Sequence, residues 1–361
     1  MGLKGVNLGN WLVLEKWMDP SLFEGTDAED ETELVHKLSK PECESLYQRH
    51  RSTFITEEDF KALKQMGVDA VRIPVPHFIF GDYPPFLGCI DVLDRAFEWA
   101  LAYGLVILID LHTIPGGQNG FDNSGLSGVC LWHTQPESQA FALSVLKRLA
   151  LRYRDHAALY GIEILNEPVS SLIWKVLNVP KTYPAVDATL GEKSYPAPVA
   201  FVEDFYNHAY RLLRQVLKPE SVIVFHDNFR PWGWKKFFKR HAYENVVLDM
   251  HLYLNYAEKV LPIKRPKTYK KIAHWVVGPL LKATQCYVPV VVGEWCLSHC
   301  GAALKTYPEP ERLQAYRDFY HLQMSMYASC QATFFWSYKL QVERLSWNYQ
   351  ALDEAGCLDP E

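Results

Sequence analysis

Eight short apolar runs alternate with longer amphipathic segments along the 361-residue chain. Several of these runs, such as Leu-Val-Ile-Leu-Ile, are apolar at every position, which is typical of parallel strands that are covered on both faces. The alternation constrains the fold more than any other feature, because repeated strand–helix units build a parallel sheet. The expected strands are residues 5–13, 70–75, 105–111, 161–165, 221–225, 246–253, 289–293 and 333–338.

The segments between the runs have helical periodicity and helical end signals. Residues 57–66 follow Thr56, a candidate N-cap, begin with three acids and stop at Gly67. Residues 90–103 stop at Gly104, and further helices are expected at residues 138–153, 198–217 and 310–327. Eight strands alternating with helices predict an α/β fold, a (β/α)8 TIM barrel that forms a single domain over residues 1–361.

A doubly wound, nucleotide-binding sheet is the competing fold. It would normally have a glycine-rich phosphate turn after its first strand, but residues 5–11 do not read G-x-G-x-x-G, and no P-loop motif occurs. We therefore expect no cofactor.

Residues 169–198 form the largest irregular insertion and follow the fourth strand, so they would extend the catalytic rim of a barrel. A plain surface excursion and a functional loop both remain open for this insertion.

Composition excludes several classes of partner. The net charge of −5, from 37 basic and 42 acidic residues, argues against nucleic acid, which needs a concentrated basic face. No run approaches the roughly 18 apolar residues of a membrane helix.

The eight scattered cysteines are interpreted as reduced thiols rather than a disulfide or zinc framework. The N-terminus shows no leader, so we expect a cytoplasmic protein, or a secreted one if a leader was removed. The oligomeric state is left open.

Polar residues gather at the carboxyl ends of the expected strands, where side chains of a barrel meet above its axis. Six strands end in this way, which core packing does not explain. The residues are Arg72, His112, Asn166, Glu167, His251, Tyr253, Glu294 and Trp336.

Two of these residues are carboxylates, Glu167 and Glu294. Glycoside hydrolysis needs two carboxyl groups that flank the scissile bond, one protonated to act as an acid and the other ionised. Arg72 is a candidate cation for holding a carboxylate ionised, and Tyr253 could donate a hydrogen bond to the same group. Glu163, in the middle of its strand, is interpreted as a structural carboxylate that is paired inside the barrel.

Other strand-end residues suit sugar binding. Asn166 could bond the sugar 2-hydroxyl group, and Trp336 is either a stacking floor for a sugar ring or a core aromatic residue. A metal hydrolase on the same fold would usually have a His-x-His pair or a similar motif, and none occurs. We therefore expect no metal, and we interpret His112 and His251 as hydrogen-bonding groups of a sugar site.

Longer motifs resemble those of a known family. They include Asn166-Glu167-Pro168, Gly293-Glu294-Trp295, residues 5–15, residues 117–125, Phe335-Trp336-Ser-Tyr-Lys339 and Trp347-Asn-Tyr-Gln350. With these motifs the sequence resembles glycoside hydrolase family 5, and within it the exo-β-1,3-glucanases of fungal type. The resemblance implies that Glu167 is the general acid/base and Glu294 the nucleophile.

The same resemblance implies roles for the substrate pocket. Glu15 and Asp122 would grip hydroxyl groups of the terminal glucose and close the cleft, which makes such enzymes exo-acting. Phe121 and Tyr256 would form an aromatic clamp at the entrance. The insertion at residues 169–198 has no counterpart in the family pattern, so the leaving group stays open: a β-1,3-glucan, a short β-glucoside or a non-sugar alcohol.

The sequence thus predicts a retaining, exo-acting β-glucosidase or exo-β-1,3-glucanase that releases glucose by double displacement. Its expected partner is a β-glucan oligosaccharide or a β-glucoside. A β-glycosidase of a non-sugar aglycone is the alternative within the same chemistry. A non-catalytic carbohydrate-binding barrel is the alternative from another class, although such a protein would be expected to have lost a carboxylate.

Overall fold

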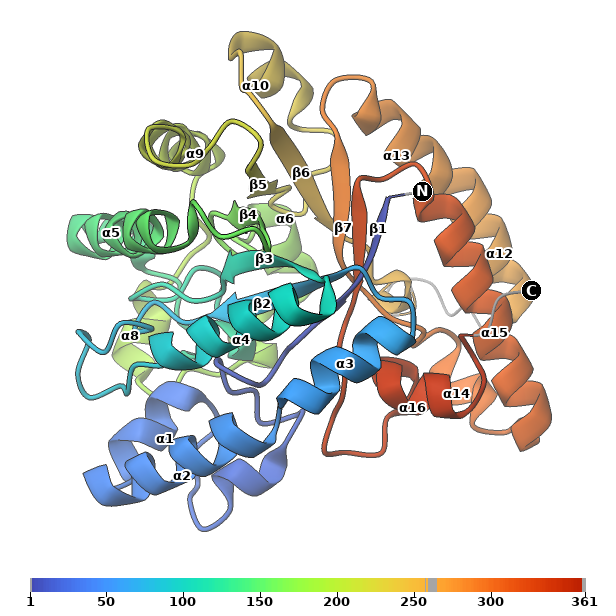
Figure 1. Cartoon of the computed structure of the whole chain (residues 1–361), viewed down its shortest axis with the longest axis horizontal. Helices are drawn as coiled ribbons and strands as arrows, with labels where there is room; N and C mark the ends of the chain where they lie inside the picture. Colours follow the sequence, from blue (N-terminus) through green and yellow to red (C-terminus); the bar gives the residue numbers. More distant parts are fainter. Residues whose placement is uncertain (1, 257, 259–264, 359–361) are drawn as a thin grey trace.

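The strands of the computed structural model close into one parallel barrel in chain order, as predicted. The structure describes residues 2–256, 258 and 265–358. The first strand pairs with both the second and the eighth, which closes the ring (Figure 1). The strands are β1 Leu3–Asn7, β2 Ala70–Val75, β3 Val106–Leu111, β4 Leu159–Glu163, β5 Val222–His226, β6 Val246–His251, β7 Val290–Trp295 and β8 Ala332–Phe335.

Helices surround this barrel, and the five expected ones are present with ends shifted by at most a few residues. In α3, Thr56 and Asp59 form a capping box, with the Thr56 backbone N–H 2.7 Å from the Asp59 carboxylate. The larger helices are α1 Glu31–Lys37, α2 Lys40–Thr53, α3 Glu57–Gln65, α4 Ile90–Tyr103, α5 Pro136–Tyr153, α9 Val199–Arg214, α10 Lys235–Arg240, α12 Pro266–Ile272, α13 Gly278–Gln285, α15 Glu309–Tyr327 and α16 Tyr349–Glu354. A π-helical turn, Ala273–Val277, joins α12 to α13.

Several of the predicted strands extend beyond the carboxyl ends of the strands in the structure. Residues 8–13, 252–253 and 336–338 lie outside the ladder. They are apolar because they pack beside the barrel or line a cavity, as the buried residues Leu8, Leu12 and Tyr338 illustrate. Apolar character alone therefore overestimates these strands at their carboxyl ends.

The barrel interior is layered because side chains of a strand alternate between its two faces. Ala70, Leu108 and Val247 point inward and pack in an apolar cluster at the base of the barrel. Two residues further along the same strands, the inward positions are Arg72, Asp110 and Asp249, all fully buried. The barrel therefore carries a buried polar layer directly above its apolar plug.

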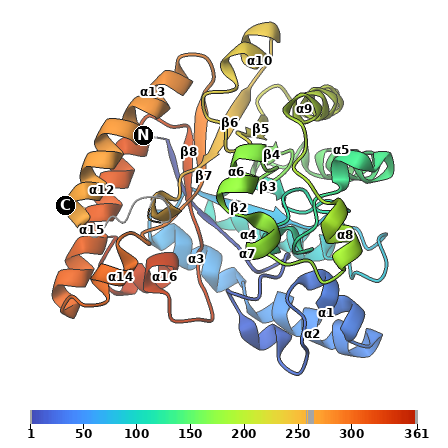
Figure 2. The same ribbon diagram turned by 180° about the vertical axis from the view of Figure 1, so that it is seen from behind.

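The insertion at residues 169–198 is more ordered than expected. It contains three short helices, α6 Ser171–Val176, α7 Val179–Thr182 and α8 Ala188–Lys193. Figure 2 shows α6 and α7 in front of the barrel strands. The prediction of an irregular segment was wrong, because helices of four to six residues leave too little periodicity to detect.

No helix among the described residues combines the length and apolarity needed to cross a membrane.

Candidate active site

Arg72 is the centre of the buried polar layer, and its guanidinium contacts three carboxylates. Nε donates to Glu163 at 2.8 Å, Nη2 lies 3.1 Å from Asp110, and Nη1 donates to Glu294 at 3.0 Å. Nη2 also donates to the amide oxygen of Asn166 at 2.9 Å. Burial would disfavour the cation, but the surrounding carboxylates outweigh burial and raise the pKa of Arg72. The predicted pairing of Glu163 inside the barrel is confirmed.

Glu294 follows Gly293 on β7, and each of its carboxylate oxygens accepts a hydrogen bond. Oε1 accepts from Arg72, and Oε2 accepts from the Tyr253 hydroxyl group at 2.7 Å. Burial raises the pKa of Glu294, while the charges of His251 and Arg72 act in the opposite direction. The two hydrogen bonds also fix the orientation of the carboxylate.

Glu167 lies directly beyond β4, in a left-handed conformation with φ of 46°. Its Oε2 accepts from the Asn123 amide at 2.8 Å, and its Oε1 lies 2.6 Å from Nδ1 of His251. Burial favours the neutral acid, but the charge and hydrogen bond of His251 outweigh it and lower the pKa of Glu167 to about 2.

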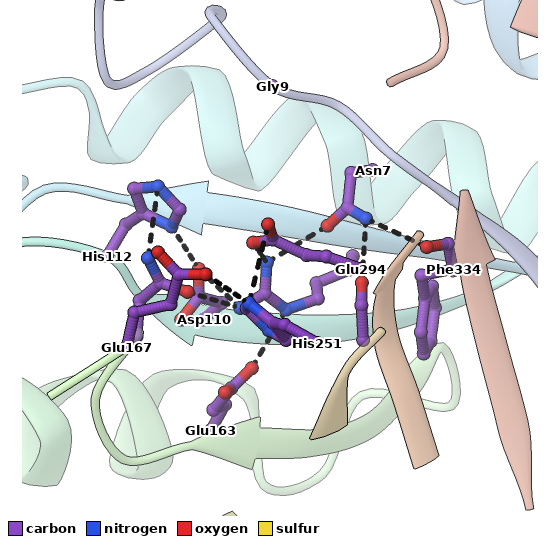
Figure 3. Close-up of polar contacts among 12 residues, drawn as sticks. Asn7, Gly9, Asp110, His112, Glu163, Glu167, His251, Glu294 and Phe334 are labelled. Carbon is purple, nitrogen blue, oxygen red and sulfur yellow. Dashed lines mark hydrogen bonds and ion pairs between the residues drawn. The ribbon is translucent and has the colours of Figure 1, made fainter. Parts of the chain in front are cut away.

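His251, at the end of β6, connects the two glutamates (Figure 3). Its Nδ1 lies 2.6 Å from Glu167 and 3.4 Å from Glu294, and its Nε2 lies 3.3 Å from Asp249. Burial alone would lower the pKa of His251, but Glu294, Asp249 and Glu167 together raise it well above its ordinary value. His251 and Glu167 therefore form a coupled pair that shares a proton across the 2.6 Å contact.

This arrangement adds a partner to the expected acid. We expected Glu167 to hold the proton, which stays a prediction, and the structure places Nδ1 of His251 at hydrogen-bond distance from Oε1 of Glu167, so the two side chains share one proton. The cause is the short distance between these two side chains, which the sequence does not encode locally. The two distances from Nδ1 also bound the gap between the nearer oxygens of Glu167 and Glu294 at about 6 Å.

A cavity of about 510 Å³ opens above these glutamates. Among the residues predicted for the site, Glu15, Phe121, Asp122, His251, Tyr253 and Trp336 line it together with both glutamates. Glu15 accepts a hydrogen bond from the Trp17 indole at 2.7 Å. Burial and the nearby Asp122 raise the pKa of Glu15, and burial raises the pKa of Asp122 to about 6.

Three predicted residues lie beneath the cavity wall rather than on it. Arg72, His112 and Asn166 are fully buried and do not line the cavity. The His112 Nδ1 lies 2.5 Å from Asp110, which leaves its Nε2 to accept from the Asn166 amide at 3.4 Å. His112 also stacks beneath Trp336, with ring centroids 5.7 Å apart. Trp336 thus has one face on His112 and contributes to the cavity lining, so the stacking-floor interpretation fits its position.

The predicted entrance clamp is only partly described. Phe121 lies at the cavity wall, with its ring 5.4 Å from that of Tyr183 and 6.5 Å from that of Phe229. The side chain of Tyr256 lies outside the part of the chain that the structure describes.

Sequence reasoning missed several lining residues. Asn123 and Trp347 lie inside motifs that were recognised, so their positions were detectable. Phe229 has a φ of 51° in the turn after β5, and no sequence signal marks it. The complete set of missed lining residues is Trp17, Asn123, Ile173, Val176, Leu177, Tyr183, Phe229, Arg344 and Trp347.

Two sets of closely spaced metal-type ligands occur among the described residues, Glu167 with His226 and His251, and Glu163 with Asp249 and His251. His251 belongs to both sets and is hydrogen-bonded to Glu167, while the Arg72 cation is bonded to Glu163. Ion pairing within the chain therefore accounts for the clustering, and the expectation of a metal-free site stays a prediction.

Comparison with known proteins gives consistent results. The family model described as Cellulase (glycosyl hydrolase family 5) matches residues 30–338. A glucan 1,3-beta-glucosidase from Schwanniomyces occidentalis is 29% identical, over 98% of this chain and 86% of its own length. A probable glucan 1,3-beta-glucosidase A from Aspergillus clavatus is 33% identical, over 86% of this chain and 69% of its own. The crystal structure of a rutinosidase from Aspergillus niger aligns with a TM-score of 0.77 at 20% identity, covering 99% and 98% of the two chains, which shows a shared fold.

Proposed function

Because this chain belongs to glycosyl hydrolase family 5, we propose that it is a retaining, exo-acting β-glucosidase that releases glucose from β-1,3-glucans or short β-glucosides. Membership of the family makes it a glycoside hydrolase. The relatives named glucan 1,3-beta-glucosidase support glucose as the released sugar and a β-1,3 linkage among its substrates.

One observation carries the retaining mechanism. The nearer oxygens of Glu167 and Glu294 are no more than about 6 Å apart. Inverting glycosidases keep roughly 6.5–9.5 Å between their carboxyl groups so that a water molecule fits between substrate and base, whereas retaining enzymes keep about 5–5.5 Å. The spacing here leaves room for the sugar carbon and excludes the additional water.

In the first step, an oxygen of Glu294 attacks the anomeric carbon and the bond to the leaving oxygen breaks. Glu167 delivers a proton to that oxygen, so the leaving group departs as a neutral alcohol. In the second step, Glu167 takes a proton from water, and the hydroxide equivalent displaces Glu294 to give glucose. Glu167 and Glu294 are then restored to their starting states.

The surrounding residues prepare the two glutamates for these roles. Arg72 and Tyr253 hold the Glu294 carboxylate by one hydrogen bond to each oxygen. His251 shares the proton that Glu167 delivers, through the 2.6 Å contact between Nδ1 and Oε1. Asn166 accepts from Arg72 beneath the cavity wall and so helps to hold the guanidinium that contacts Glu294.

The polar residues of the cavity support cleavage at the non-reducing end of the substrate. Glu15 and Asp122 lie together on the cavity wall with Trp17, and two carboxyl groups beside an indole suit the hydroxyl groups and the face of a terminal sugar. A terminal sugar held in this way gives glucose as the only early product.

Proton NMR of the first turnover of methyl β-D-glucoside tests this proposal, because methanol is the leaving group and all of the glucose formed comes from the cleaved bond. We expect β-glucose first, with the α-anomer rising only by mutarotation. An initial burst of α-glucose would contradict the retaining mechanism. A ladder of oligomers released from laminarihexaose, instead of glucose, would contradict exo action.

A further inference from the structure

The cavity above the glutamates has two walls of opposite chemistry. One wall carries hydrogen-bonding groups, chiefly Glu15, Trp17 and Asp122. The other wall is built from Ile173, Val176 and Leu177, together with the rings of Phe121, Tyr183 and Phe229. Apart from the Tyr183 hydroxyl group, the side chains of this second wall offer no hydrogen bond, and we call these six residues the apolar wall.

The insertion that supplies most of the apolar wall is fixed against the barrel rim. Its Trp174 packs over Gly120, where an added Cβ atom would lie 3.0 Å from the indole. Its Ala185 packs over Gly128, where an added Cβ atom would lie 2.4 Å from the Ala185 nitrogen. These two close approaches hold residues 169–198 over the cavity, so the wall is a built surface.

The apolar wall lies on the side of the proton donor. Val169, two residues after Glu167, is buried in one cluster with Phe121, and Ile173, Leu177, Tyr183 and Phe229 pack against that cluster. In the proposed reaction Glu167 protonates the leaving oxygen, so the group attached to that oxygen must lie beside Glu167. The leaving group therefore meets the apolar wall, while the glucose meets the polar wall.

We propose that the leaving group this enzyme takes best is an apolar alcohol, so that its preferred substrates are β-glucosides of hydrophobic aliphatic or aromatic alcohols. The proposal rests on the proposed β-glucosidase function and specifies its substrate class. A second sugar at this position would bury its hydroxyl groups against Ile173, Val176 and Leu177, and unpaired polar groups are costly to bury. An alkyl or aryl chain instead gains from burial of its own apolar surface.

A series of alkyl glucosides tests the proposal in the wild-type enzyme. Full burial of one methylene group corresponds to roughly a fourfold gain, and half burial to about twofold. We therefore expect kcat/KM for hexyl β-D-glucoside to exceed that for methyl β-D-glucoside by at least roughly 30-fold, and to exceed that for laminaribiose. A hexyl-to-methyl ratio near one, or laminaribiose as the better substrate, would overturn the proposal.

A matched pair of variants on α6 locates the effect. Leu177 lines the cavity, whereas Leu172 is 64% exposed and does not. Leu177→Asn should lower the hexyl-to-methyl ratio by about tenfold, and Leu172→Asn should leave it unchanged. Equal ratios in the two variants would contradict the assignment of the leaving group to the apolar wall.

Two further probes separate this proposal from the proposed function. β-D-Glucosyl fluoride needs no contact with the apolar wall, so its hydrolysis reports the glucose side and the two glutamates alone. Hexyl and methyl 1-thio-β-D-glucosides resist hydrolysis, so calorimetry with them reports binding alone. Hydrolysis of the fluoride without a hexyl preference would overturn only the leaving-group proposal. A hexyl preference in binding without hydrolysis of the fluoride would overturn the proposed function and leave the apolar site supported.

Discussion

At the scale of single residues, His251 is positioned to share the catalytic proton with Glu167. One nitrogen of this side chain lies within 3.4 Å of both glutamates, and the other lies 3.3 Å from Asp249. Three carboxylates around one imidazole favour its charged form. The active proton therefore belongs to a coupled group, and its titration is a property of His251 and Glu167 together.

We predict that His251→Asn narrows the pH range over which kcat/KM is high, with the acidic limb at higher pH and the alkaline limb at lower pH than in the wild type. Loss of the cation leaves Glu294 buried with less opposing charge, so its pKa rises further and the acidic limb moves to higher pH. The proton for catalysis then leaves from Glu167 alone instead of from the Glu167–His251 pair, whose imidazole has a raised pKa, so the alkaline limb moves to lower pH. The profile on methyl β-D-glucoside measures both limbs.

The control for this variant is His208→Asn, because His208 is exposed on α9. It should leave both limbs in place. An alkaline limb that is unchanged in His251→Asn would show that the proton is not held by this pair.

We predict that Glu167→Gln and Glu294→Gln lose activity in different patterns. Glu167→Gln should lose roughly 10²–10⁴-fold on methyl β-D-glucoside, the usual contribution of a general acid, but less on glucosyl fluoride, whose leaving group needs less protonation. Glu294→Gln should lose most activity on both substrates, because no nucleophile remains. The exposed Glu343→Gln is the control. Near-normal rates in either variant of the pair would contradict the assignment.

Much of this site could be predicted from the sequence, because strand ends of a barrel converge. Glu167, Glu294, Arg72 and Tyr253 were expected near one another for that reason, and the structure brings them together. The pairing of Glu167 with His251 could not be predicted, because it depends on a distance of 2.6 Å between their side chains. Side chains 84 positions apart in the sequence carry no signal of such a contact.

At the scale of elements, the insertion after β4 shows what sequence patterns miss. Helices of four to six residues are not stable alone, and they form here because Trp174 and Val179 pack over Gly120. Its position after the fourth strand was predicted, whereas its helices and its apolar wall were not. Tertiary packing, rather than helix propensity, determines its structure.

We predict that Trp174→Ala loosens this insertion without unfolding the barrel. The half-buried indole and Val179 are the closest contacts of the insertion with Gly120, and loss of the indole should favour local opening by about 2 kcal/mol. Trypsin should then cut at the exposed residues Lys175, Lys181 and Lys193 more than tenfold faster. Mass spectrometry of the fragments measures each cut.

Trp275→Ala is the matched control. This tryptophan is 73% exposed and lies in the π-helical turn between α12 and α13, outside the insertion. It should leave the three cleavage rates unchanged. Equal rates of trypsin cleavage within the insertion in Trp174→Ala and Trp275→Ala would show that Trp174 does not anchor the insertion.

At the scale of the whole molecule, the barrel could be predicted from the sequence, but the second apolar cluster between β1 and α2 could not. Eight alternating strand and helix signals define the ring, and β1 pairing with β8 closes it. Apolar residues between Leu14 and Tyr47 instead form a separate cluster around α1 and α2 together with Phe78 and Phe86, and these two helices lie beside the barrel in Figure 1. Within it Glu31 is 1% exposed and accepts hydrogen bonds from the Leu14 backbone N–H and the Tyr47 hydroxyl group.

This buried carboxyl group makes the stability of the whole molecule depend on pH. Burial raises the pKa of Glu31 from 4.5 to about 7 in the folded protein. The folded state therefore binds a proton more tightly than the unfolded chain, so this contribution is fully present below pH 4.5 and is lost as pH rises through about 7. Between pH 5 and pH 8 the loss amounts to about 2.5 kcal/mol.

We predict that Glu31→Gln removes this loss, because glutamine keeps an acceptor for Leu14 and cannot ionise. The difference in Tm between variant and wild type should shift in favour of the variant by roughly 3 °C from pH 5 to pH 8. Scanning calorimetry of both proteins at four pH values measures the shift, and contributions from every other titrating group cancel in the difference. A difference in Tm that stays constant with pH would show that Glu31 ionises in the folded protein as readily as in the unfolded chain.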